Sequence, residues 1–136
     1  MPADSRTKTT IIKLRKHKRT KEKTCLVTAY DYPQALIADK AGVDAILVGD
    51  SCGMTTHGYK TTLPVTMDEM INHCEAVSRG AKDAFLIGDM PYMSYQESDE
   101  LAVRNAGRFI VAGMDCVKVE GAMVDRVKAI ADSGIM

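Results

Sequence analysis

Short runs of apolar residues alternate along this chain with longer segments whose apolar side chains recur at helical spacing. The short runs predict strands over residues 24–29, 44–49, 84–88 and 115–119. The longer segments predict helices that begin near Asp31, Thr66 and Ser98, and a last helix over residues 123–131. Strict alternation of strands and helices is typical of right-handed βαβ units and a parallel sheet.

The ends of these helices have capping signals. Asp31 precedes Pro33, which suits a first helical turn, and Gly42 suits the end of the same helix. Thr66 and Glu69 have the spacing of a capping box. The helix that follows Thr66 is expected to bury Met67, Met70, Ile71, Cys74 and Val77, and the helix that follows Ser98 is expected to bury Leu101, Ala102, Ala106, Phe109 and Ile110.

Two five-residue segments, 41–45 and 112–116, resemble each other, and each joins a helix end, a glycine and a strand start. This repetition fits either a doubly wound sheet or a (βα)8 barrel, the TIM-barrel fold. No glycine-rich nucleotide motif follows any strand, which weakens the first reading. Acids follow three strands, at Asp50, Asp89 and Glu120. Because barrel enzymes place catalytic groups at the carboxyl ends of their strands, these acids favour the barrel.

Composition and charge narrow the class of protein. The chain has 136 residues and is 46% hydrophobic, which suits one packed domain. Residues 1–23 hold nine Lys or Arg against two acids, and we expect residues 1–9 to be disordered and residues 11–17 to form a short helix. No nucleic-acid motif accompanies this basic arm, so a solvated arm or one that packs on a neighbouring subunit is favoured. Four cysteines without paired spacing, no membrane-length apolar run and no secretory signal indicate a cytoplasmic protein.

Several separated motifs resemble the ketopantoate hydroxymethyltransferase family. They cover residues 28–32, 49–54, 62–70, 89–95 and 117–121, in the family's order and spacing. The resemblance extends over about residues 11 to 136. Cys52 and residues 55–57 are atypical for the family and bear on loop packing.

The resemblance implies a reaction and a set of ligands. The family transfers a hydroxymethyl group from 5,10-methylenetetrahydrofolate to 3-methyl-2-oxobutanoate (α-ketoisovalerate) and gives 2-dehydropantoate for pantothenate synthesis. It uses Mg²⁺ or another divalent metal and assembles into homo-oligomers. By motif, Asp50, Asp89 and Glu120 would hold the metal. Asp50, Ser51, Asp89 and Lys118 would bind the keto acid, with Lys118 as a point charge on its carboxylate.

The length predicts an incomplete barrel, since a full one needs about 250 residues. Residues 1–23 would form the basic arm and residues 24–136 the N-terminal half, with four βα units. By resemblance, the family's general base, a glutamate, would lie beyond Met136, so we expect the chain to be inactive alone. Two alternatives stay open. One is a metal-dependent enzyme of the phosphoenolpyruvate mutase and isocitrate lyase group, which acts on α-keto acids, and the other is a non-catalytic half barrel. His57 and His73 have no ligand-spaced partner in the sequence, so we interpret them as a loop residue and a helix-surface residue.

Overall fold

The computed structural model describes residues 6–136 and contains one parallel sheet of four strands. The strands lie side by side in chain order. They are β1 (Leu26–Thr28), β2 (Ala45–Val48), β3 (Phe85–Asp89) and β4 (Cys116–Lys118). The helices are α1 (Ile11–Thr20), α2 (Tyr32–Lys40), α3 (Cys52–Thr55), α4 (Met67–Gly80), α5 (Asp99–Val111) and α6 (Val124–Asp132).

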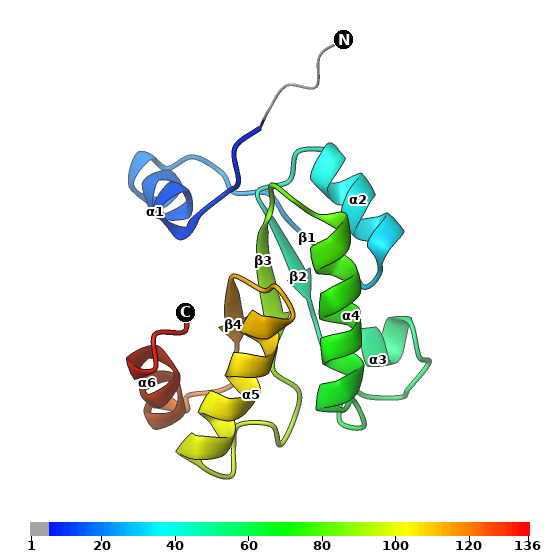
Figure 1. Ribbon diagram of the computed structural model, residues 1–136, viewed down its shortest axis with the longest axis vertical. Helices are drawn as coiled ribbons and strands as arrows, with labels where there is room; N and C mark the ends of the chain where they lie inside the picture. Colours follow the sequence, from blue (N-terminus) through cyan, green and yellow to red (C-terminus); the bar gives the residue numbers. More distant parts are fainter. Residues whose placement is uncertain (1–5) are drawn as a thin grey trace.

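The strand order distinguishes between the two predicted architectures. Each strand pairs in parallel with its sequence neighbour and the order never reverses. A doubly wound sheet needs such a reversal, whereas successive right-handed crossovers without it leave the helices on one side. Figure 1 shows α2, α4 and α5 stacked along one side of the sheet. The fold is therefore four consecutive βα units of a TIM barrel, as predicted.

The core lies between the sheet and these helices. Ile46 and Leu86 point from the sheet into a fully buried cluster with Met70, Val77 and Phe109 of the helices. Gly88 belongs to the same face of β3, because a Cβ atom there would lie 2.3 Å from Phe109. The opposite face has less cover. Leu26 is 47% exposed, and Leu47 and Ile87 are only partly buried.

The helix starts match the sequence signals. Asp31, Thr66 and Ser98 each accept a hydrogen bond at a helix start, and Thr66 and Glu69 form the predicted capping box. One predicted core position is wrong: Ile110 is exposed, and Asn105 of the same helix is buried instead. Asn105 donates to the carbonyl of Ser94 at 2.7 Å, which allows a polar side chain in this position.

The basic arm packs on this chain over the part that the structure describes. Lys8 bonds to the carbonyl of Ala84, and the Thr9 N–H donates to the carbonyl of Asp83. Arg6 bonds to the carbonyl of Val43. These carbonyls precede β2 and β3, so the segment crosses the end of the sheet where the strands begin. The expected disorder is therefore wrong for residues 6–9, while residues 1–5 lie outside the described residues.

The repeated segments 41–45 and 112–116 have one structural role. Gly42 and Gly113 both adopt positive φ, at 87° and 97°. The aspartate two residues after each glycine reaches back to the preceding strand: Asp44 accepts from Cys25 N at 3.0 Å and Asp115 accepts from Leu86 N at 2.7 Å. Each also pairs with a lysine of the arm, Lys13 with Asp44 and Lys8 with Asp115. The repeat therefore joins neighbouring strands and anchors the arm.

We expect Asp44→Asn to lower the free energy of unfolding by about 1 kcal/mol at neutral pH, because it weakens a charge-assisted bond. Burial opposes ionisation of Asp44, but the Cys25 N–H and Lys13 outweigh it and lower the pKa. A lowered pKa adds stability above the unfolded-state value and loses it as the pH falls through the folded-state value. The free energy of unfolding of the variant, measured in urea, should therefore change less with pH in the acid range. Asp132→Asn, at an exposed pair with Lys128, is the control and should change little.

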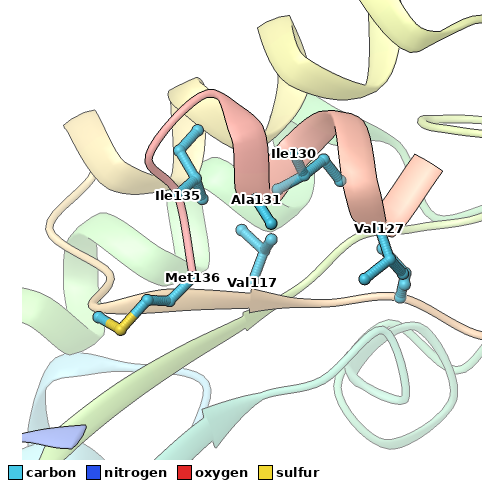
Figure 2. Close-up of a pocket in the computed structure, with 7 residues that line it drawn as sticks. Val117, Val127, Ile130, Ala131, Ile135 and Met136 are labelled. Atoms are coloured by element: carbon cyan, nitrogen blue, oxygen red, sulfur yellow. The ribbon is translucent and has the colours of Figure 1, made fainter. Parts of the chain in front are cut away.

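An apolar pocket lies between β4 and α6. It measures about 120 Å³ and is lined by Val117, Val119, Val127, Ile130, Ala131, Ile135 and Met136 (Figure 2). The carbonyl oxygen of Met136 accepts from Val117 N at 2.8 Å. Val117 and Val119 alternate with Lys118, so the pocket is on the helix side of β4 and is separate from the candidate site. Among residues 6–136, no helix is both long and apolar enough to cross a bilayer.

Candidate active site

The predicted site residues lie at the carboxyl ends of three neighbouring strands. Asp50 follows β2 after Gly49, Asp89 is the last residue of β3, and Lys118 is the last residue of β4. Asp89 and Lys118 are register partners. The Asp50 N–H donates to Asp89 Oδ2 at 3.2 Å, so the turn after β2 is tied to the end of β3. The parallel register therefore brings these residues together, as predicted.

Lys118 joins two of the acids. Its Nζ donates to Asp89 Oδ1 at 2.6 Å and also to Glu120 Oε1. Lys118 and Glu120 therefore lie on the same side of the chain. Asp89 is 3% exposed, and its burial raises its pKa, which Lys118 and the Asp50 N–H oppose. Burial lowers the pKa of Lys118, but the two carboxylates outweigh it and raise the pKa, so this lysine stays charged.

Ser51 is held by a residue that sequence reasoning missed. Its Oγ is 2.9 Å from the hydroxyl of Tyr30, which lies in the loop after β1. Gly49 makes room for this arrangement, because a Cβ atom there would lie 3.0 Å from Ser51 Oγ and 3.7 Å from Asp89 Oδ2. Tyr30 belongs to the 28–32 motif, but no spacing in the sequence pairs it with Ser51.

Tyr95 is a second missed residue. Its buried hydroxyl accepts from Glu120 N at 2.9 Å and donates to the Glu120 carbonyl at 3.2 Å. The loop after β3 thereby fixes the backbone of Glu120, while the side chain of Glu120 stays largely exposed. A buried tyrosine hydroxyl needs a polar partner, and here both partners are main-chain groups of a candidate site residue.

The loop after β2 has a defined path. It contains the short helix α3, and it brings His57 next to His73 of α4, with 2.9 Å between their Nε2 atoms. His57 lies in the loop and His73 on α4, as interpreted, but their spacing in the sequence did not predict this contact. Cys52 is buried in this loop, and burial raises its pKa to about 11, so it stays a neutral thiol.

The acids have the donor chemistry of a magnesium site. Among residues 6–136, no group of three or more His, Cys, Asp or Glu side chains is already arranged around one point. However, Asp89 and Glu120 both contact the ammonium of Lys118, so two carboxylates already converge on one positive charge. Carboxylate oxygens are the ligands that Mg²⁺ prefers. The residues therefore fit a hard cation, and the metal role of Asp50, Asp89 and Glu120 stays a prediction.

Comparison with solved structures supports the barrel. The chain superposes on 2,3-dimethylmalate lyase, a member of the PEP mutase/isocitrate lyase superfamily, with a TM-score of 0.70 and 19% identity, over 90% of this chain and 47% of that one. Phosphoenolpyruvate phosphomutase from Streptomyces platensis subsp. rosaceus gives a TM-score of 0.70 at 18% identity, over 88% and 48% of the two chains. At these identities the likeness concerns the fold alone.

Sequence comparison gives a narrower result. The chain is 53% identical over 131 residues to the 3-methyl-2-oxobutanoate hydroxymethyltransferase of Alkaliphilus metalliredigens, covering 94% of this chain and 46% of that protein. It is 54% identical over 125 residues to the enzyme of the same name from Thermotoga sp. (strain RQ2), covering 90% and 46%. The chain thus spans about half the length of the curated relatives it matches. The sequence pattern of the ketopantoate hydroxymethyltransferase family matches residues 8–136, and the chain belongs to that family.

Proposed function

We propose that this chain provides the keto-acid and metal side of a 3-methyl-2-oxobutanoate hydroxymethyltransferase. The complete enzyme would transfer a hydroxymethyl group from 5,10-methylenetetrahydrofolate to α-ketoisovalerate. The main support is the joining of Asp50, Asp89 and Lys118 at one end of the sheet, together with identity above 50% to enzymes of that name. The phosphoenolpyruvate mutase alternative has only the shared fold to support it.

The proposed roles follow from charge and position. Asp50, Asp89 and Glu120 would hold Mg²⁺, which when bound would polarise the ketone and stabilise the negative charge that develops after loss of a β-proton. Lys118 would meet the keto-acid carboxylate, because its ammonium lies beside Asp89 and stays charged. Ser51 would donate or accept a hydrogen bond to the same substrate, with Tyr30 fixing its hydroxyl. The proposal includes homo-oligomer formation and a cytoplasmic location, as the resemblance implies.

The test is a covalent chimera that joins residues 1–136 to the C-terminal half of the Alkaliphilus metalliredigens enzyme. We expect the chimera to form 2-dehydropantoate when α-ketoisovalerate, methylenetetrahydrofolate and Mg²⁺ are supplied. A chimera with a native circular dichroism spectrum and thermal transition, but with no turnover, would contradict the proposal. The unmodified Alkaliphilus enzyme is the positive control.

Within that chimera, Lys118→Met should raise the KM for the keto acid roughly 10–100-fold, because a charge-assisted hydrogen bond is removed. The KM for the folate should change much less. The variant also leaves Asp89 buried without its counter-ion, which should raise the pKa of Asp89 further and move the acid limb of the activity profile to higher pH. Steady-state kinetics with each substrate varied in turn gives both readouts. Equal effects on the two substrates would indicate a structural role for Lys118.

A further inference from the structure

The two histidine rings, His57 and His73, meet through their Nε2 atoms. Their Nε2 atoms are 2.9 Å apart, and the ring centroids are 5.2 Å apart. His57 belongs to the loop after β2 and His73 to α4. The contact therefore joins two elements, through residues that are 16 positions apart in the sequence. A separation of 2.9 Å between two ring nitrogens requires a proton between them, because two bare lone pairs repel each other.

The far side of each ring faces an acceptor. His57 Nδ1 lies 3.2 Å from the Glu69 carboxylate, and His73 Nδ1 lies 2.6 Å from the carbonyl oxygen of Tyr30. A carbonyl only accepts hydrogen bonds, so His73 Nδ1 has a proton. His73 Nε2 then accepts from His57 Nε2, and one proton lies between the two rings.

The surrounding groups favour this arrangement. The Thr66 N–H, the hydroxyl of Tyr59 and that of Thr66 lower the pKa of Glu69 to about 2, with a further contribution from His57, so the carboxylate stays ionised. Tyr59 donates to the same Glu69 oxygen at 2.7 Å. On α2, which packs against α4, the Asp31 carboxylate is bonded to Gln34. Glu69 is therefore the anion in contact with the pair.

The chain of contacts ends at the substrate site. The Tyr30 carbonyl accepts from His73, and the hydroxyl of the same Tyr30 lies 2.9 Å from Ser51 Oγ. The Tyr30 N–H also donates to the side-chain oxygen of Gln34 at 3.1 Å. Tyr30 is thus fixed at its N–H, its carbonyl and its hydroxyl. We propose that His57 and His73 are positioning residues that share one proton, clamp the loop after β2 to α4 and, through Tyr30, hold Ser51 in place for the keto acid. The role of Ser51 rests on the proposed function, whereas the shared proton does not.

The shared proton is tested directly on the 136-residue chain with ¹⁵N-labelled histidine. NMR should show His73 protonated at Nδ1, His57 protonated at Nε2, and one proton that correlates with Nε2 of each ring. Assignment uses His57→Gln and His73→Gln. Spectra showing His73 protonated at Nε2 alone, or two rings without a common proton, would overturn the proposal. A metal ion found in stoichiometric amount would also overturn it, since the facing nitrogens would then be ligands.

The link to Ser51 is tested in the chimera with two matched variants. In His73→Asn, the side-chain amide nitrogen takes the place of Nδ1 and keeps the bond to the Tyr30 carbonyl. In His73→Gln, the amide nitrogen takes the place of Nε2 and this bond is lost. His73→Gln should raise the keto-acid KM roughly tenfold, and His73→Asn should change it by about twofold or less. The folate KM should not change in either variant. Equal keto-acid KM values in the two variants would overturn the link, and an inactive chimera would contradict the proposed function while leaving the NMR result intact.

Discussion

Asp50→Asn in the chimera is expected to reduce turnover to near background, at least about 10²–10³-fold, the scale of losing one preorganised electrostatic contact. The substitution keeps the shape of the side chain and removes the negative charge that we propose is directed at the metal. The backbone N–H of Asp50, which donates to Asp89, is unaffected, so the turn after β2 should keep its position. The loss should therefore appear in kcat and in Mg²⁺ affinity, with no change in the thermal transition.

The control for this experiment is Asp68→Asn. Asp68 is an exposed acid in the first turn of α4, where it pairs with Arg108. Asp68→Asn removes the same charge from the chain, at a place that does not contact the candidate site. Titration of each variant with Mn²⁺, followed by electron paramagnetic resonance, measures metal binding without reference to activity. Near-normal turnover and metal affinity for Asp50→Asn would disprove its assignment as a ligand.

The sheet and its helices could be predicted because their signals are local. Alternating apolar runs fix which segments are strands, and caps such as Thr66 with Glu69 fix where helices begin. In a parallel sheet, the ends of the strands then meet at one edge, so Asp89 and Lys118 could be placed together before their register was known. Lys118 ends β4, and Glu120, two residues later, lies on the same side and pairs with it.

The missed contacts depend on the path of loops, which residue spacing does not encode. His57 reaches His73 only because α3 and the turn after it direct the loop back over α4. The docking of Arg6, Lys8 and Thr9 depends on backbone carbonyls at the start of the sheet, which have no sequence signature. Ile110 was misplaced because helical spacing alone cannot show where the neighbouring helix stops covering a face.

The 136-residue chain alone is expected to show no hydroxymethyl transfer, even with Mg²⁺ and methylenetetrahydrofolate supplied. A β-proton of a keto acid is weakly acidic, and a positioned general base is typically worth about 10²–10⁴-fold. In this chain Asp89 and Glu120 are both engaged by Lys118, and Asp50 is assigned to the metal, so none of the three is available as that base. The inner face of the sheet is also incompletely covered, since Leu47 and Ile87, just before the site residues, are only partly buried, so water would reach the reacting centre.

Adding the separately produced C-terminal half of the Alkaliphilus enzyme should restore activity. This chain aligns over 131 residues with only 46% of that enzyme, so the added half would supply what the alignment does not cover. Turnover should then rise with the concentration of the added half and saturate near equal amounts. The same half mixed with an Asp50→Asn chain is the control and should stay inactive. Measurable turnover by the 136-residue chain without any addition would show that a base lies within it, and would require Asp50 or Glu120 to be reassigned from metal binding to proton transfer.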